Sequence, residues 1–395
     1  MIAQWVMDPD LATALLGGLS PTAFMRRHWQ KRPLLVRAAL PDALPALDPR
    51  RLFALAAQEG VESRLVVRDE HDRWSLRPGP LPRRALPSLA TPGWTLLVQG
   101  VDLHDDDAHR LLSRFRFVAD ARLDDLMVSY ASDGGGVGPH ADSYDVFLLQ
   151  LAGQRRWRVG PVSKPRLRDD VPLKMLAAFT PRHDWLLGPG DMLYLPPGWG
   201  HDGVAEGPCL TASIGFRAPA TTELGVDLLE RIVDAQRDDA ADHDDDAPTR
   251  AIAPRYRDRS EAATAHPARV PEGLQRFGVA AVSRLLADRQ AQARALGESL
   301  SEPKPGVRFD ASAAAATEAG VVLDRRTRML YDDGHVYVNG ESYRAGGRDA
   351  ALMRVLADER RLSSKGVARL SAEAASLLLR WATDGWCHGA DPAPK

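Results

Sequence analysis

Two short motifs in this sequence carry side chains that could bind a single metal ion. The first is His140-Ala141-Asp142, and the second is a glycine- and proline-rich run that ends at His201. Side chains two positions apart on a strand point to the same face, so His140 and Asp142 can bind one ion together. Two imidazoles and one carboxylate form the facial triad of non-haem Fe(II) oxygenases, which leaves positions open for an organic co-substrate and O₂. The sequence therefore predicts His140, Asp142 and His201 as metal ligands and as the catalytic centre.

The surroundings of these residues favour a metal site, because an isolated His-x-Asp is also common as a hydrogen-bonded surface pair. The spacing over 134–140, a glycine followed by five residues and a histidine, resembles the first half of the cupin barrel motif. The run 190–201 resembles the second half, and the halves follow in the expected order. The glutamate that many cupins carry after the first half is missing, since Val146 and Phe147 stand there. This departure argues against a four-ligand cupin site.

Five longer runs are informative, and they are Phe24–Val36, Arg122–Tyr130, Gly134–Phe147, Gly153–Gly160 and Ser213–Arg217. Together they resemble the bacterial Jumonji-C (JmjC) ribosomal oxygenases, the Fe(II)- and 2-oxoglutarate-dependent arginine hydroxylases of the large-subunit ribosomal protein uL16. The resemblance covers most of residues 20–220 and, more weakly, the layout beyond. It implies Fe(II) as cofactor, 2-oxoglutarate and O₂ as co-substrates, and a ribosomal protein as substrate. It also implies that Ser129 contacts 2-oxoglutarate, whereas the sequence alone indicates an ordinary strand serine.

A dianionic co-substrate needs a second cation besides the metal, and Arg155 is the candidate. In the run 155–159, strand alternation places Arg155 with Trp157 and Val159 on one face, which is otherwise apolar and therefore points inward. A buried arginine without an anion is strongly disfavoured by desolvation, whereas a bidentate contact with a carboxylate offsets that penalty. We predict that Arg155 binds the distal carboxylate, with an ion pair to a barrel acid as the alternative. The predicted cofactor-binding residues are Ser129, His140 and Arg155.

Contacts to a substrate are less defined by the sequence. An arginine side chain would need a carboxylate for its guanidinium and aromatic rings beside its stem. Proximity to the metal motif selects four candidates, each of which could equally be a turn or packing residue. They are Asp133, Asp145, Tyr130 and Tyr144.

Composition limits the class of protein. A chain of 395 residues is expected to form two or three domains. No run approaches the ~20 apolar residues of a membrane span, and the first residues lack the basic region of a secretory signal. Two cysteines without Cys-x-x-Cys spacing exclude a thiolate zinc site and fit a reducing compartment. We expect a cytoplasmic protein without membrane association, and the net charge of −2 predicts no direct nucleic-acid binding.

The periodicity changes along the chain. Short strand-like runs up to residue 217, preceded by helical segments near 21–29 and 50–58, predict a helix-decorated double-stranded β-helix barrel. Beyond it, Leu224, Leu228 and Ile232 form one helical stripe, and a second follows. Such stripes need a partner surface, so we predict a homodimer, with packing on the barrel or the C-terminal region as the alternative. The second stripe consists of Leu274, Phe277, Ala281 and Leu285.

Two further segments complete the chain. The acid-rich segment 238–246 contains His243 and could bind a metal, although a solvated loop is the simpler interpretation. Beyond a proline-containing linker at 301–306, hairpins and two helices resemble a winged helix. Residues 307–395 hold 13 Lys and Arg against 12 Asp and Glu, so no basic excess favours DNA contacts.

These observations define a fold class and a function, with alternatives. We expect a mixed α and β protein with a cupin/JmjC oxygenase domain at 1–217, a helical dimerisation region at 218–302 and a winged-helix-like domain at 303–395. The expected function is hydroxylation of an arginine in a large-subunit ribosomal protein. The alternatives are a metal- or ligand-sensing cupin with a winged helix, which is not an enzyme, and a protein demethylase that uses the same iron site.

Overall fold

The structure is a computed structural model that describes residues 7–40, 47–241, 255–259, 262–311 and 319–390. Packing divides the chain into two compact units. The first contains Met1–Ala218, Lys304–Thr327 and Ala351–Lys395, and the second contains Pro219–Pro303 and Arg328–Ala350. Among the described residues, none of the helices combines the length and the apolar character needed to cross a membrane.

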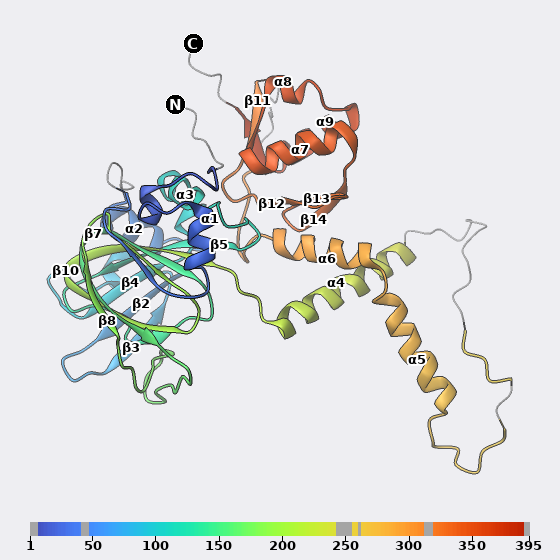
Figure 1. The fold of residues 1–395 in the computed structure, drawn as a ribbon, viewed down its shortest axis with the longest axis horizontal. Helices are drawn as coiled ribbons and strands as arrows, with labels where there is room; N and C mark the ends of the chain where they lie inside the picture. Colours follow the sequence, from blue (N-terminus) through green and yellow to red (C-terminus); the bar gives the residue numbers. More distant parts are fainter. Residues whose placement is uncertain (1–6, 41–46, 242–254, 260–261, 312–318, 391–395) are drawn as a thin grey trace. The chain divides into compact units, whose positions relative to one another are not determined.

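The first unit is built on one large sheet that curls into a barrel (Figure 1). Its strands are β1 (Leu34–Val36), β2 (Ser63–Arg68), β3 (Trp74–Pro78), β4 (Trp94–Val98), β5 (Leu123–Ala131), β6 (His140–Ala141), β7 (Val146–Pro161), β8 (His183–Leu187), β9 (Met192–Leu195) and β10 (Trp199–Phe216). The order is β1-β9-β7-β10-β5-β4-β2-β3, with β6 paired to β10 and β8 to β7. Every pairing is antiparallel. The predicted mixed α and β fold with a cupin/JmjC barrel is confirmed.

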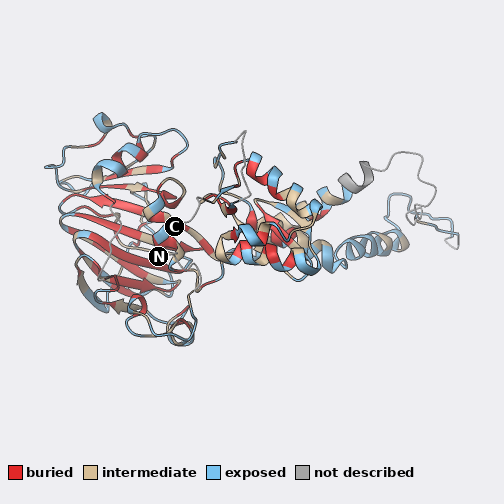
Figure 2. Cartoon of the chain, turned by 90° about the horizontal axis from the view of Figure 1, so that it is seen from above, coloured by how far each residue is buried: buried red, intermediate tan, exposed pale blue. Residues whose placement is uncertain are grey.

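Helices cover the outer face of the barrel. They are α1 (Pro21–Arg27), α2 (Pro49–Ala56) and α3 (Asp106–Ser113). The first two begin as predicted because the side chains of Ser20 and Asp48 cap them and a proline occupies the first turn. The ring of Phe24 on α1 lies 5.5 Å from that of Phe147 on β7. The neighbours of Phe147 on this strand belong to a separate inner cluster, so one face of β7 holds the helices and the other lines the interior. Figure 2 shows these strands largely buried.

The second unit combines the helices α4 (Thr221–Ala241), α5 (Glu272–Leu285) and α6 (Arg289–Ser301) with the strands β12 (Met329–Tyr331), β13 (His335–Val338) and β14 (Glu341–Arg344). The ring of Tyr337 packs where a Cβ on Gly297 would lie only 2.2 Å away. This close approach fixes β13 against α6.

The remaining C-terminal elements form a three-stranded sheet in the order β15-β11-β16 with helices around it. They are β11 (Gly320–Leu323), α7 (Gly347–Glu359), β15 (Arg361–Ser363), α8 (Ser364–Val367), α9 (Ala372–Thr383) and β16 (Cys387–Gly389). The predicted boundaries at residues 217 and 302 remain predictions, because packing groups β12–β14 with α4–α6 and most of the other C-terminal elements with the barrel.

The stripe predicted on α4 was expected to form the dimer interface, and this expectation is wrong for Ile232. Ile232 is only 5% exposed, and Leu224 and Leu228 are half-buried, within the unit where α4 packs against α6. The exposed apolar residues of α4 are Val226, Leu229 and Val233. Of the acid-rich segment 238–246, residues 242–246, with His243, lie outside the described residues.

An ion cluster stabilises the C-terminal part of the first unit and gives a test of stability. The carboxylate of Asp324 accepts hydrogen bonds from Arg326 Nε at 2.7 Å and lies 2.9 Å from His388 Nε2. Burial by itself raises the pKa of Asp324, but the hydrogen bonds from Arg326 and His388 outweigh it and lower the pKa to about 2. Because the folded pKa lies below the unfolded one, this stabilisation is present above pH ~4 and is lost as the pH falls through ~2.

Asp324→Asn is therefore expected to lower the free energy of unfolding by about 2 kcal/mol at pH 7 and by much less near pH 2. Denaturant titrations at both pH values measure the difference. Asp310→Asn is the matched control, since Asp310 pairs with the same Arg326 but its side chain is 88% exposed, and it should have little effect. An equal loss at both pH values would show that Asp324 acts through packing and not through charge.

Candidate metal centre

The barrel brings the three predicted metal ligands together. β6 pairs with β10 so that His140 lies directly opposite His201, and their ring centroids are 4.1 Å apart. Asp142 follows β6, and its Oδ2 lies 3.7 Å from His201 Nε2. One ligand atom from each residue can be chosen so that all lie within 4.8 Å of one another. This spacing suits a single ion bound by all three side chains.

Backbone carbonyls orient both imidazoles. Nδ1 of His140 lies 2.9 Å from the carbonyl oxygen of Gly138, and Nδ1 of His201 lies 3.2 Å from that of Trp199. A carbonyl can only accept, so each Nδ1 carries the hydrogen and each Nε2 keeps a free lone pair. Metal-binding histidines are commonly fixed in this way.

The ionisation of the site also fits a divalent cation. Burial lowers the pKa of His201 well below its ordinary value, and the nearby His140 lowers it further, so His201 is neutral and able to bind a metal. Burial raises the pKa of the Asp142 carboxyl, because an ionised carboxylate is poorly solvated there. A bound cation would compensate that charge. Two imidazoles and one carboxylate match the donor preference of Fe(II).

Small residues make the close pairing possible. Gly200 separates His201 from the strand turn, and a Cβ there would lie 2.6 Å from Val162 and 2.8 Å from Phe179. Gly138 has a φ of +75°, which favours glycine. The glycine-rich run of the first motif therefore shapes the loop that carries His140.

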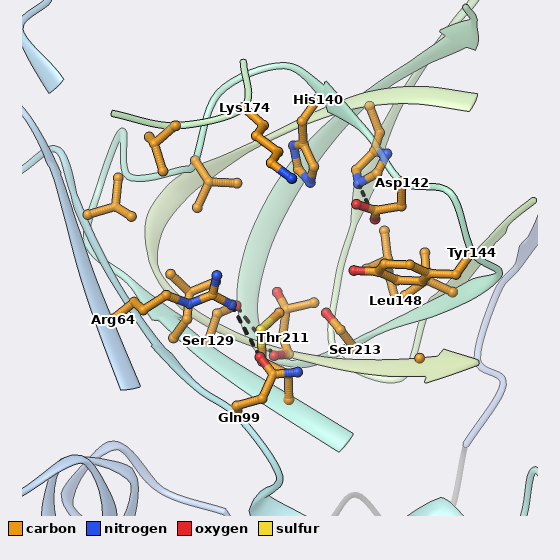
Figure 3. A pocket seen from close by; sticks show the side chains of 18 of the residues that line it. Arg64, Gln99, Ser129, His140, Asp142, Tyr144, Leu148, Lys174, Thr211 and Ser213 are labelled. Atoms are coloured by element: carbon orange, nitrogen blue, oxygen red, sulfur yellow. Dashed lines mark hydrogen bonds and ion pairs between the residues drawn. The ribbon is translucent and has the colours of Figure 1, made fainter. Parts of the chain in front are cut away.

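The metal ligands open into a cavity of about 260 Å³ inside the barrel. Figure 3 shows His140 and Asp142 at one end and Ser129 and Thr211 at another. Arg155, Trp157 and Met127 also line it. The cavity thus connects the three ligands with polar groups deeper in the barrel.

Arg155 lies in this deeper part, as strand alternation predicts. It is 3% exposed, and its guanidinium donates to Ser129 Oγ at 3.2 Å, Thr211 Oγ1 at 3.4 Å and the Gly203 carbonyl oxygen at 3.2 Å. Its Nε is buried without a hydrogen-bond partner. Among the described residues no carboxylate lies within ion-pair distance of Arg155, so the alternative of a barrel ion pair is not observed. A buried cation without an anion indicates a site for one.

The outward arginines of the same strand behave differently. Arg156 forms ion pairs with Asp184 at 2.9 Å and Glu206 at 2.6 Å on the exposed side of the sheet. Arg158 lies 3.8 Å from Asp202. Only Arg155 among these three faces the cavity.

Of the four predicted substrate contacts, only Tyr144 lines the cavity. The carboxylate of Asp145 is fully buried and accepts from the Tyr194 hydroxyl at 2.6 Å. Tyr130 packs in the core, with its ring 5.3 Å from that of Phe53. Asp133 accepts from the backbone N–H of Gly207 at a turn. These three side chains have structural contacts outside the cavity.

The sequence analysis missed other charged residues of the cavity, which are Arg64, Asp124, Asp125 and Lys174. A signal for Asp125 was available. Ser129 was expected to face the co-substrate, and residues 127 and 125 share its face of the strand by alternation. Proximity in sequence to the metal motif was the wrong criterion, because β5 reaches the cavity from another part of the chain.

The chain is similar in sequence to known oxygenases and to two family models. Residues 110–224 match a family model described as a JmjC domain, and residues 284–388 match one described as a ROXA-like winged helix. The ribosomal protein uL16 3-hydroxylase of Escherichia coli K12 is 38% identical over 231 residues, which are 58% of this chain and 61% of that protein. A probable ribosomal oxygenase of Haemophilus influenzae is 37% identical over 216 residues, 52% of each chain. The alignments thus span about half to three fifths of these relatives.

Solved structures match over a longer range. The E. coli ribosomal oxygenase YcfD is similar with a TM-score of 0.77 and 30% identity, over 93% of this chain and 97% of that one. A structure of YcfD in complex with cobalt and 2-oxoglutarate matches with a TM-score of 0.77 and 29% identity, over 93% and 98% of the two chains. The barrel and the C-terminal elements therefore share one architecture with these proteins.

Proposed function

We propose that this chain, which belongs to the JmjC-domain ribosomal oxygenases, is an Fe(II)- and 2-oxoglutarate-dependent hydroxylase of an arginine side chain in a large-subunit ribosomal protein. One observation carries the proposal. A single cavity joins the cluster of His140, Asp142 and His201 to the buried, anion-free guanidinium of Arg155. A dicarboxylate that binds the metal with one end needs a cation for its other end, and this cavity provides both.

The roles of the residues follow from this arrangement. His140, Asp142 and His201 would hold Fe(II), and Arg155 with Ser129 would bind the distal carboxylate of 2-oxoglutarate by charge-assisted hydrogen bonds. When bound, Fe(II), 2-oxoglutarate and O₂ supply the oxidant that hydroxylates a C–H bond. The barrel contributes orientation, because Arg155 and the three ligands are fixed on paired strands.

Other residues that line the cavity suit a cationic side chain. Asp124 and Asp125 line it, and Tyr144 presents a ring that is 40% exposed. A carboxylate beside an aromatic ring is a favourable environment for a guanidinium. These features support an arginine target, and the E. coli relative is named a 3-hydroxylase of ribosomal protein uL16.

The decisive experiment exposes the Fe(II)-loaded protein and 2-oxoglutarate to O₂ together with ribosomal protein uL16, and then analyses the protein by mass spectrometry. A gain of one oxygen atom on an arginine, with succinate formed in equal amount, is the expected result. Loss of a methyl group from a methylated substrate would favour the demethylase alternative, and a more distant Drosophila relative is named as both demethylase and hydroxylase. Binding of Fe(II) and 2-oxoglutarate without any product would favour the sensor alternative.

Assembly as a homodimer is part of the proposal. α5 has 14 residues and none of them is buried, and its exposed apolar side chains are Leu274, Val279, Val282 and Leu285. A helix with so little packing is unstable alone and needs a partner surface. A second copy of the chain is the commonest partner.

Val279→Glu combined with Val282→Glu is therefore expected to yield a monomer that still binds Fe(II), because both side chains lie outside the barrel unit. Val279 and Val282 are 68% and 57% exposed. They are chosen for this test in place of the stripe that contains Ile232, because a charge at the buried Ile232 would disrupt folding. Sedimentation of the wild type and the double variant measures the change. A monomeric wild type at micromolar concentration would contradict the dimer but not the hydroxylase.

Location and other partners remain predictions. A ribosomal-protein substrate is consistent with a cytoplasmic enzyme, and the nearly balanced charge of residues 307–395 gives no basic surface for nucleic acid. We expect the winged-helix region to contact protein and not DNA.

A further inference from the structure

Two acidic residues that line the cavity, Asp124 and Asp125, are already paired with a cation of the protein itself. The Lys304 ammonium lies 2.8 Å from Asp125 Oδ2 and 3.2 Å from Asp124 Oδ1. Its side chain is 25% exposed. The chain leaves the barrel unit after Ala218 and returns to it at Lys304, so this ion pair forms where the chain rejoins the barrel.

The two carboxylates have other contacts that keep them in place. Asp125 Oδ2 accepts hydrogen bonds from the backbone N–H of Gly100 at 3.0 Å and from Gln99 Nε2 at 2.8 Å. Asp124 Oδ1 lies 3.4 Å from Arg217 Nε. Departure of Lys304 would therefore leave the acidic pair in position, ready for another cation.

Lys304 itself is held less firmly. Its ammonium has no partner other than these two carboxylates among the described ion pairs and hydrogen bonds, and its chain neighbours are Pro303 and Pro305. Proline has no backbone N–H, so neither neighbour can donate a backbone hydrogen bond that would fix the segment. The Lys304 carbonyl oxygen accepts a hydrogen bond from the backbone N–H of Val307 at 3.2 Å, which is local to the turn. The ion pair is thus the polar attachment of the Lys304 side chain to the barrel.

A third acidic group, Asp102, lies next to this pair and shares its electrostatic environment. Asp102 is 3% exposed and accepts a hydrogen bond from the backbone N–H of Leu126 at 2.8 Å. Burial, followed by the charge of Asp125, raises the pKa of Asp102 to about 7. Asp102 is therefore only partly ionised near neutral pH, and Asp124 and Asp125 supply most of the negative charge that the Lys304 ammonium offsets.

We propose that Lys304 is an internal competitor of the substrate, an ammonium that occupies the acidic pair of Asp124 and Asp125 until a cationic substrate side chain displaces it. The inference rests on the proposed function for the nature of the substrate. It makes Lys304 a residue that sets substrate affinity and selectivity: a guanidinium with two parallel donors can displace a single ammonium, whereas a neutral side chain cannot.

Binding measurements test this without turnover. The Mn(II)- and 2-oxoglutarate-loaded protein is titrated, without O₂, with acetyl-Gly-Arg-Gly-amide and with the same peptide carrying citrulline, which is neutral and nearly the same shape. Lys304→Ala is expected to bind the arginine peptide about threefold to tenfold more tightly than the wild type, on the order of one ion pair. The citrulline peptide should bind both proteins alike. Lys304→Arg keeps the cation and should not gain affinity, and Lys365→Ala, at an exposed position on α8, is the matched control.

Lysine reactivity gives a second test in the wild-type protein. Brief treatment with an amine acylating reagent, read by mass spectrometry, should modify Lys304 more slowly than Lys365 in the absence of peptide. Saturation with the arginine peptide should then increase the rate at Lys304 several-fold.

Two results would overturn the proposal: equal arginine-peptide affinity of wild type and Lys304→Ala, or no preference for arginine over citrulline in either protein. A Lys304 reactivity that stays constant or falls with peptide would do the same. Failure of uL16 hydroxylation alone would contradict only the proposed function, because the peptide measurements do not depend on product formation.

Discussion

Replacing His201 with alanine is expected to abolish Fe(II) binding and hydroxylation. A three-ligand site has no spare donor, and His201 is the buried member, 3% exposed, opposite His140 on the paired strands. Loss of an outer partner of a metal ligand already lowers affinity or activity ~10- to 100-fold. Loss of the ligand itself should therefore exceed about a hundredfold. Metal content after dialysis and the rate of succinate formation are the measurements.

His183→Ala is the matched control for this experiment. His183 is exposed on β8 and stacks on Trp185 with ring centroids 4.5 Å apart, so its loss removes an imidazole from the same sheet without touching the cavity. Asp142→Asn separates charge from shape, and it should weaken metal binding although the side chain keeps its size. Full activity in any of the variants at His140, Asp142 or His201 would contradict the assignment of that residue as a ligand.

Local patterns in the sequence predicted much of this site. Strand alternation is a property of a few consecutive residues, so it placed Arg155 and Trp157 inside and Arg156 outside, as the structure has them. The spacing of the glycine-rich motifs likewise predicted that His140 and His201 come together, although the pairing of β6 with β10 spans about sixty residues of chain.

Contacts between distant segments could not be predicted from these local patterns. Asp133 and Asp145 are near the metal motif in sequence, yet their side chains form hydrogen bonds elsewhere because turns and strand ends redirect the backbone. Tyr130 follows Ser129 on β5, so strand alternation turns its ring to the face opposite the cavity. The helical stripe that contains Ile232 is a second case in which the sequence did not predict the contact. Periodicity identifies an apolar face, but it does not say whether that face packs within the chain or against another molecule, and here Ile232 is buried within its own unit.

Loss of the Arg155 guanidinium is also expected to have a large effect, in this case on 2-oxoglutarate binding. Arg155→Ala is expected to raise the 2-oxoglutarate concentration needed for half-maximal rate by at least about thirtyfold, because truncating one partner of a buried charge pair costs ~2 to 5 kcal/mol. The affinity for the metal should change little, since Arg155 is not one of the three ligands. Lys at this position should recover part of the loss, as it keeps the charge but not the two parallel donors.

Arg156→Ala is the control for Arg155→Ala, since the neighbouring arginine lies on the outer face of the same strand and pairs with Asp184 and Glu206. Its 2-oxoglutarate requirement should equal that of the wild type. Trp157 provides a readout without turnover, because its ring lies 5.0 Å from the Arg155 guanidinium, and its fluorescence should report 2-oxoglutarate binding to the Mn(II)-loaded protein. If Arg155→Ala keeps the wild-type requirement in both assays, the distal carboxylate must bind another cation of the cavity, and Arg64 and Lys174 are then the residues to replace next.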